Sequence, residues 1–249
     1  IQLRGLSPDQ VLVLVNGKRR HTNSLVHINT TVGRGTSNVD LTAIPIASIE
    51  RVEILRDGAA AQYGSDAIAG VINIVLKQNT GEFSIASNAG ITQKGDGATI
   101  EMAANQGFRL GESGFLNIGA NFSNRSATNR MDIFNGSIYD ENTAKDDSIL
   151  LAKGLNRSDF NMRVGNAAMR NTGIMANMAM PLGGGLEVYA FGGVTRKDGE
   201  SAGFFRRPIQ TDRVVSSLYP NGFLPEIYTT NGDVSFTGGL RGQIRDWNV

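Results

Sequence analysis

The 249-residue sequence predicts a region of short buried strands and turns, followed by antiparallel strands of the kind that form membrane β-barrels. Two apolar, β-type runs lie within residues 44–77 on either side of a glycine-containing turn. From residue 82 onward, apolar and polar residues alternate with the period of two that is typical of strands with one buried face. Some connections between these alternating runs are short and others are long, and both long ones fall on the same side of the predicted sheet, as in membrane barrels.

The composition agrees with this fold class. Hydrophobic residues make up 40% of the chain, charged residues 19%, and there are 31 glycines. No run approaches the roughly 18 apolar residues of a membrane-spanning helix, which argues against a helical membrane protein. The chain has 0 cysteines, which excludes a disulfide scaffold. The net charge of +1 gives no reason to expect a nucleic-acid partner. Because it begins with Ile1 rather than Met, we expect an internal part of a longer protein.

The first predicted strand is the apolar run Val11–Val15, which is short enough to be a buried strand. Asn16 and Gly17 follow it and both tolerate positive φ, so they predict a tight turn. Residues 18–40 are polar and almost without periodicity, which predicts a loop, and long loops on a rigid scaffold often carry binding residues. The run Lys18-Arg19-Arg20 at its start has no interleaved aromatic residues. We interpret it as a solvated face rather than an anion site.

Residues 44–77 contain the most specific pattern in the chain, with predicted strands at 51–56 and 70–76. They resemble the plug domain of TonB-dependent outer-membrane receptors. The matching residues are Pro45, Ile49-Glu50-Arg51-Val52-Glu53-Ile54-Leu55-Arg56, Tyr63-Gly64 and Gly70-Val71-Ile72-Asn73-Ile74. One departure is Asp57-Gly58, where many relatives have Gly-Pro, another pair of turn formers. With the Val11–Gly17 segment included, the resemblance covers nearly all of residues 1–77.

The resemblance implies an α+β plug remnant with a small mixed sheet in residues 1–78. Residues 79–249 would be the N-terminal portion of an antiparallel transmembrane β-barrel, contributing about six of roughly 22 strands. The implied function is uptake of a scarce, bulky nutrient (an iron-siderophore, cobalamin, haem or an oligosaccharide) across the outer membrane of a Gram-negative bacterium. The energy would come from TonB, through a TonB box expected before residue 1. The residues themselves suggest no catalytic constellation and no cofactor, and the two histidines, His21 and His27, do not by themselves define a metal site.

The same resemblance implies two groups of functional residues. In the family, the plug loops that face outward touch the substrate, and by position these are Arg4, His21, Thr22, Asn23, His27, Asn29, Thr30 and Arg34. For each of them, a solvated loop position or packing between plug and barrel remains the alternative. Glu53 and Arg56 match plug charges that pair with the inner barrel wall. Their odd spacing puts them on opposite faces of a regular strand, which disfavours a catalytic pair.

Alternation predicts the barrel strands in residues 82–92, 99–110 and 116–125, each near the 9–11 residues that a bilayer crossing needs. A long polar stretch, 126–170, precedes a fourth strand. In the fifth, residues 186–196, the pair Val188 and Ala190 competes with Tyr189 and Phe191 for the apolar face. The last strand centres on Phe236. Both long connections, 126–170 and 197–233, fall on one side of the sheet, which is the arrangement of extracellular loops.

Two other functions remain open from the sequence. A passive porin-like or adhesin barrel without TonB coupling explains the strands but not the plug pattern. A soluble β-rich enzyme lacks a nucleophile–base constellation. The acidic group Asp140, Glu141, Asp146 and Asp147 lacks the spacing of a Ca²⁺ loop and is predicted to be solvated. Residues 201–225 are rich in Phe, Arg and Tyr, which suits either stacking on a sugar or aromatic chelate or a loop packed on itself.

Overall fold

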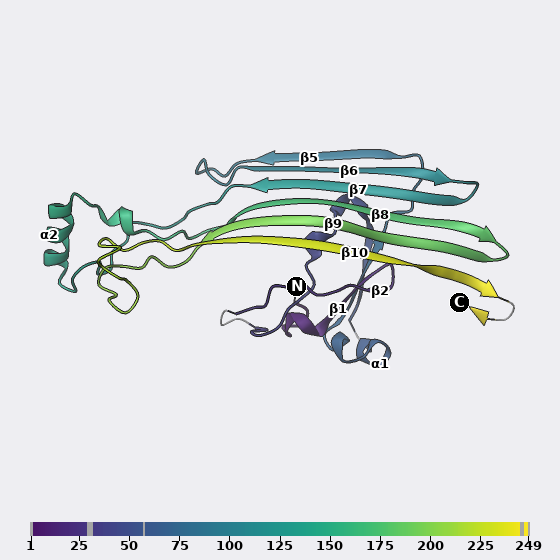
Figure 1. Ribbon diagram of the computed structural model, residues 1–249, viewed down its shortest axis with the longest axis horizontal. Helices are drawn as coiled ribbons and strands as arrows, with labels where there is room; N and C mark the ends of the chain where they lie inside the picture. The colour runs from purple at the N-terminus through teal and green to yellow at the C-terminus, as the bar shows by residue number, and fades with distance from the viewer. Residues whose placement is uncertain (1, 29–31, 57, 245–246, 249) are drawn as a thin grey trace.

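The computed structural model describes residues 2–28, 32–56, 58–244 and 247–248, and these form two sheets and a lobe of loops (Figure 1). The small sheet has the strand order β2-β1-β4-β3. Its strands are β1 (Val11–Val15), β2 (Lys18–Arg19), β3 (Ile49–Leu55) and β4 (Gly70–Leu76). The short helices around it are η1 (Pro8–Gln10), η2 (Leu41–Ala43), η3 (Ile46–Ser48), α1 (Ala59–Tyr63) and η4 (Ser65–Ala67).

The small sheet is mixed, as the resemblance implied. β1 runs parallel to β4, while β3 pairs with β4 and β2 pairs with β1 in the antiparallel direction. The predicted tight turn after β1 is confirmed, because Asn16 and Gly17 have φ values of 48° and 76°. These positive values are those of the two-residue turns that match the twist of a hairpin. The predicted turn between β3 and β4 holds the short helix α1 as well.

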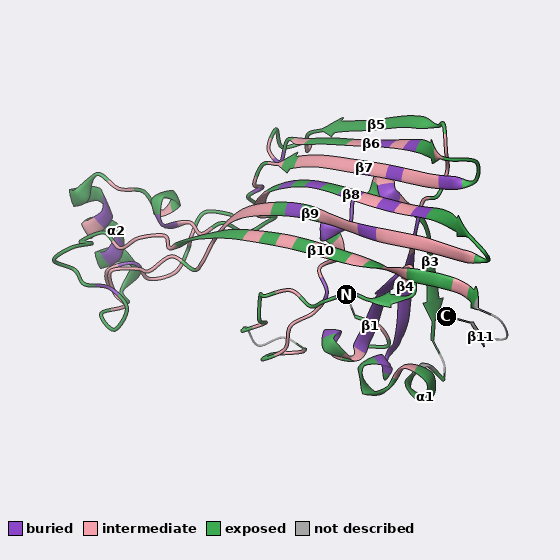
Figure 2. Cartoon of the chain, turned by 45° about the vertical axis from the view of Figure 1, so that its right-hand side comes forward, coloured by how far each residue is buried: buried purple, intermediate pink, exposed green. Residues whose placement is uncertain are grey.

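The core of the small sheet has two faces. Val11, Val13 and Val15 point to one face and pack with β4 and with Met175 and Phe191 of the large sheet. Leu12 and Leu14 point to the other face and pack against Ala67 and Val71. All of β1 is therefore buried, which explains why its sequence is a continuous apolar run rather than an alternation (Figure 2).

The large sheet is antiparallel, with strands in sequence order from β5 to β11. Its strands are β5 (Phe83–Gly90), β6 (Thr99–Leu110), β7 (Gly114–Arg125), β8 (Ala168–Gly183), β9 (Leu186–Ala202), β10 (Glu226–Ile244) and β11 (Trp247–Asn248). The β9–β10 ladder continues to Ala202 and Glu226, so the predicted connection 197–233 shrinks to 203–225. Charged and polar side chains on these strand ends hid the extension, because they interrupt the apolar alternation.

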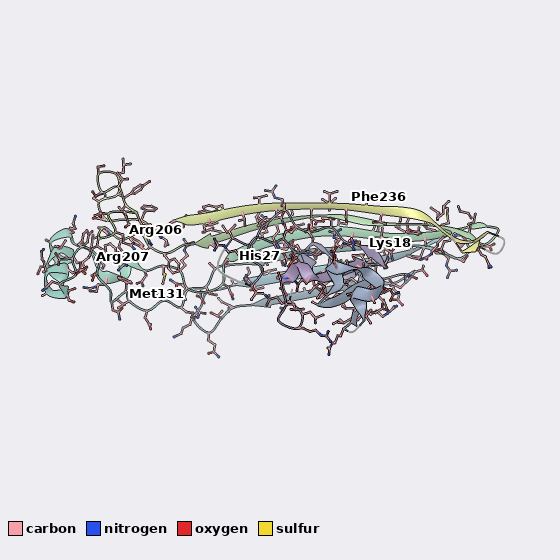
Figure 3. All side chains as sticks on the ribbon, turned by 90° about the horizontal axis from the view of Figure 1, so that it is seen from below. Lys18, His27, Met131, Arg206, Arg207 and Phe236 are labelled. Carbon is pink, nitrogen blue, oxygen red and sulfur yellow. The ribbon has the colours of Figure 1, made fainter. Side chains whose placement is uncertain are left out.

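The two faces of the large sheet differ as the alternation predicted. Val234, Phe236 and Leu240 of β10 are exposed on the face away from the small sheet, where Figure 3 shows Phe236. The sequence left open which face of β9 is the apolar face that meets the core. In the structure, Tyr189 and Phe191 pack against the core of the small sheet. Val188 and Ala190 therefore belong to the face away from it.

Residues 126–167 and 203–225 form a lobe, here called the loop lobe, which extends beyond the ends of β7–β10 (Figure 1). It contains α2 (Thr143–Lys153) and η5 (Arg157–Phe160) and has its own core of Ile138, Leu150 and Phe160. The sequence indicated only a long polar connection here and did not predict these helices, whose small core needs only a few widely spaced apolar residues. None of the helices in the described ranges has the length and apolar character to cross a membrane.

Candidate functional site

The small sheet lies against the inner face of the large sheet along a polar seam. Asn171 donates a hydrogen bond to the carbonyl of Thr42 (3.0 Å), and Thr195 donates to the carbonyl of Ala43 (2.8 Å). Asn177 donates in the same way to the carbonyl of Lys77 (2.9 Å). Short polar side chains at inward positions of β8 and β9 thereby satisfy backbone acceptors that would otherwise be buried without partners.

Ion pairs connect the two sheets at the same seam. Arg20 pairs with Asp233 of β10, and His21 Nε2 lies 2.9 Å from the other oxygen of Asp233. The side chains of Arg20 and Asp233 are only 5% and 15% exposed. The prediction of a solvated face for Lys18-Arg19-Arg20 is therefore wrong for Arg20. The hairpin continues past β2, with Arg20 N–H donating to Val13 (2.9 Å), which brings this side chain against β10.

A second ion pair joins Asp40, at the start of η2, to Lys197 of β9. Burial by itself would raise the pKa of the Asp40 carboxyl. Hydrogen bonds from Lys197 and Thr42 outweigh burial and lower the pKa below its usual value. Asp40 is thus held in its charged form, and the seam has two charged contacts between segments distant in sequence.

Glycine allows the closest approach between the sheets. A Cβ atom on Gly119 of β7 would lie 2.1 Å from Ser48 Oγ, which is far inside a van der Waals contact. Nearby, Lys18 Nζ lies 5.8 Å from the centre of the Tyr189 ring, and Arg241 stacks on the same ring at 5.6 Å. The seam is therefore a packed interface.

Two of the predicted ligand residues contact the large sheet. His21 bonds to Asp233, and Asn23 accepts a hydrogen bond from Asn231 (3.1 Å). These contacts are of the kind expected for packing between the sheets, the alternative left open by the sequence. Arg4, Thr22 and Arg34 are exposed.

Of the remaining predicted ligand residues, His27 lies in the segment 23–28, which runs beside residues 36–38. His27 N–H donates to Thr36 (2.9 Å), and Asn23 N–H donates to Asn38 (2.7 Å), which ties these two segments together. The His27 Nε2 atom is buried without a hydrogen-bond partner among the described residues. Figure 3 shows His27 nearer to the loop lobe than Lys18. Asn29 and Thr30 lie outside the described residues.

Glu53 and Arg56 lie on and just after β3, the edge strand of the small sheet. Glu53 accepts hydrogen bonds from Asn73 (2.8 Å) and from Arg51 (2.8 Å), and these bonds lower the pKa of its carboxyl. Within the described residues, neither Glu53 nor Arg56 forms an ion pair with the large sheet. Glu53 does line a cavity of about 540 Å³ whose other side includes Tyr189 and Arg241.

The loop lobe contains a pocket of about 340 Å³. The sequence had drawn attention only to those of its residues that lie within 201–225. Aromatic, sulfur-containing and basic side chains surround it: Phe134, Phe160, Met162, Phe204, Phe205, Arg206, Arg207, Gln210 and Arg213. Arg207 lies over the Phe134 ring at 5.1 Å and donates to the carbonyl of Ser137 (2.6 Å), so it is already engaged. Figure 3 shows Arg206 and Arg207 within the lobe.

Asp146 of α2 organises the lobe. Its carboxylate, with 0% exposure of the side chain, accepts backbone hydrogen bonds at Tyr139 (2.7 Å), Ile138 (3.2 Å) and Asp140 (3.2 Å) and pairs with Arg157 (3.1 Å). Burial would raise its pKa, but these amides and Arg157 outweigh burial and lower it. The prediction that this acidic group is solvated is wrong for Asp146, whose side chain is buried. In the described parts of the chain, His, Asp and Glu form no cluster of three or more suited to a metal ion.

Residues 1–71 match the family model of the TonB-dependent receptor plug domain. The chain is similar to the ferric enterobactin receptor PirA of Pseudomonas aeruginosa, with 38% identity over 103 residues, or 40% of this chain and 14% of that protein. It is also similar to the vitamin B12 transporter BtuB of Vibrio cholerae, with 35% identity over 116 residues, or 47% of this chain and 17% of that protein. The matched regions thus span less than a fifth of these relatives.

The fold is similar to that of the ferric enterobactin receptor PfeA of P. aeruginosa, solved as a mutant with enterobactin bound. The TM-score is 0.61 at 20% identity, covering 98% of this chain and 32% of PfeA. At this identity the likeness concerns the fold, and it places the small sheet and the large sheet together in one known architecture. Residues 1–71 thus match the plug domain of TonB-dependent receptors, and the fold of the chain as a whole is similar to part of a solved receptor.

Proposed function

We propose that the protein containing this chain is an outer-membrane receptor that imports a bulky nutrient, of the iron-siderophore or cobalamin class, with energy from TonB. The observation that carries this proposal is the polar seam. The plug, here the small sheet, packs on the inner face of barrel-type strands through buried ion pairs such as Arg20–Asp233. Apolar contacts with Met175 and Phe191 help to hold the plug at rest. The ion pairs add less to the cost of release than apolar contacts in the same places would, because water solvates their charges again when the plug moves.

The passive porin or adhesin barrel is the alternative, and the packed seam argues against it. A lumen that conducts freely needs open space between plug and wall, whereas Gly119 and Ser48 touch directly. The test is uptake by the full-length receptor in cells lacking other receptors, with ferric enterobactin and cyanocobalamin as probes. Uptake of either probe that disappears in a strain without TonB supports the proposal, and uptake independent of TonB contradicts it.

Within this class, the pocket of the loop lobe favours an anionic chelate with aromatic groups. Its rings supply stacking surfaces, and Arg206 and Arg213 supply positive charge beside them. Several relatives are named as ferric enterobactin receptors, which agrees with this chemistry, while others are named as vitamin B12 transporters. We place the first ligand contact in the loop lobe and the next at the apex that carries His21, His27 and their neighbours.

Replacing Arg206 and Arg213 with Gln is expected to weaken the binding of ferric enterobactin by about tenfold for each residue, because charge-assisted contacts are lost. Lys94→Gln is the matched control, because Lys94 is exposed in the β5–β6 turn at the same end of the sheet. Arg207 is left unchanged because it supports the Ser137 carbonyl. Equal affinity of the wild-type receptor and the double variant, measured by titration of the purified full-length protein, contradicts this placement.

We also propose that the plug extends through residue 78 and that Glu53 and Arg56 pair with the wall of the complete barrel. The position of β3 at the edge of the small sheet supports this, since an edge strand has one side without a partner strand. The cavity that Glu53 shares with Arg241 supports it as well. The same pairs are then candidate points of release when the plug is pulled.

A further inference from the structure

The face of the large sheet that points away from the plug carries a hollow of about 890 Å³ that the transport function does not use. Two alanines of neighbouring strands, Ala104 and Ala120, pair across the ladder and leave the hollow between larger residues. Met102 and Phe122 stand next to them toward the loop lobe, and Ile174 pairs with Ala120 on β8. The hollow therefore has small side chains at its floor and large apolar ones at its walls.

The hollow lies at the boundary of the apolar band on this face. On β10 the band comprises Val234, Phe236 and Leu240, each more than half exposed. Toward the loop lobe, the band gives way to a row of polar partners across the strands, in which Arg170 pairs with Asn124 on one side and Asp198 on the other. Apolar side chains thus meet charged ones at one level of the sheet, as at the edge of a bilayer.

Two arginines stand at this boundary and differ in their partners. Arg196 forms an ion pair with Asp198 (3.0 Å), which also accepts a hydrogen bond from Thr230 (2.7 Å). Arg170 stacks on the Phe122 ring, with its guanidinium carbon 5.4 Å from the ring centre. No carboxylate among the described residues forms an ion pair with Arg170. The three charged groups at the rim of the hollow therefore leave a net positive charge beside an apolar surface.

We propose that this hollow binds a phospholipid with a net negative headgroup, with an acyl chain over Ala104 and Ala120 and the phosphate at Arg170 and Arg196. The inference rests on the proposed membrane location. Charge complementarity selects the occupant, because an anionic headgroup on an apolar chain matches an arginine placed directly above an apolar groove. The loop lobe stands at the same end of the sheet, so the lipid belongs to the outer leaflet.

The test uses the full-length receptor, purified and stripped of lipid, with phosphatidylglycerol as the probe and native mass spectrometry as the readout. Arg170→Gln is expected to weaken phosphatidylglycerol binding by about tenfold. Asp198→Asn removes the opposing charge and is expected to strengthen it. The matched control is Arg109→Gln, an exposed arginine at the other end of β6 that points to the opposite face, and it is expected to leave binding unchanged.

Two further arms identify the source of binding. Ala120→Trp fills the hollow and is expected to reduce phosphatidylglycerol binding, whereas inorganic phosphate alone is expected to compete poorly because it lacks the chain. Equal binding of phosphatidylglycerol and phosphatidylcholine, or equal effects of Arg170→Gln and Arg109→Gln, overturns the proposal. TonB-dependent uptake measured on the same variants separates the two hypotheses, since loss of the lipid site leaves the transport proposal intact.

Discussion

Arg20→Ala is expected to loosen the plug in its seat and to raise passive leakage through the full-length receptor. The substitution leaves the Asp233 carboxylate at the seam, 15% exposed, with only His21 beside it. A buried charge that loses its partner costs about 3–5 kcal/mol, which is a large share of the stability of a domain. The plug should therefore be displaced from the large sheet for a measurable fraction of the time.

The neighbouring residue provides a matched control. Arg19 pairs with Asp66 within the plug, and both side chains are about half exposed, at 56% and 50%. An exposed pair of this kind contributes about 0–1 kcal/mol, so Arg19→Ala should leave leakage near the wild-type level. The two variants delete the same side chain one residue apart, and only burial and the identity of the partner differ.

The measurement is single-channel conductance of the purified receptor in planar bilayers, together with its thermal unfolding. A double variant that replaces Arg20 and Asp233 with Leu should restore much of the lost stability, because a buried ion pair is often exchangeable for an apolar contact. If Arg20→Ala and Arg19→Ala leak to the same extent, the pair with Asp233 does not secure the plug.

The sequence predicted the elements whose patterns are local. The β1 run is apolar throughout because both of its faces are buried, and the strands β6 and β7 alternate because one of their faces lies toward the small sheet and the other points away from it. The Asn16–Gly17 turn was predictable because few residues adopt positive φ without strain. These signals need no knowledge of distant contacts.

The sequence did not predict the partners at the seam. Arg20 and Asp233 are separated by most of the chain, and nothing near either residue marks it as buried. The roles of Thr195 and Asn171 were not predicted either. A polar residue on the inward face of a strand gives the same sequence pattern whether its side chain contacts water or a carbonyl of the plug. Their roles follow from packing between segments far apart in sequence, which a periodicity argument does not contain.

The loop lobe was missed for a related reason. Ile138, Leu150 and Phe160 are widely spaced within a polar stretch, and they form a core only after α2 folds back on the preceding residues. The helix does begin with a recognisable signal, since Asn142 accepts a hydrogen bond from Lys145 N–H (3.1 Å). Gly154 at the end of α2 and the Asn156–Asp159 capping box of η5 are further local signs of order in the stretch.

Asp146→Ala is expected to unfold the loop lobe locally, with a cost of about 3 kcal/mol or more to its stability. The carboxylate accepts hydrogen bonds from three backbone amides, which would lose this acceptor, whereas Arg157 would keep its contacts with Asp147 and the Gly136 carbonyl. The aromatic pocket lies in the same lobe, with Phe160 in both the core and the pocket wall. Binding of ferric enterobactin should weaken together with the fold of the lobe.

Asp147→Ala is the matched control, because Asp147 pairs with the same Arg157 (2.8 Å) but is 57% exposed. Hydrogen exchange of the full-length receptor is the direct readout, with amides of Ile138 and Tyr139 as reporters. Faster exchange is expected at these amides in Asp146→Ala and not in Asp147→Ala. Similar protection in both variants contradicts the role assigned to Asp146.

The pH dependence of the lobe gives an independent check with a defined sign. The pKa of Asp146 lies below its usual value of 3.8, so the folded lobe binds this proton less readily than the unfolded chain. The contribution of Asp146 is therefore complete at neutral pH and above the unfolded value, and it falls as the pH drops through the lower folded value. The protection factors of the reporter amides, which correct for the slower intrinsic exchange in acid, should fall at low pH in the wild type, while the already weakened Asp146→Ala lobe should lack this step. A lobe that gains stability in the same acidic range would require a different charged state for Asp146.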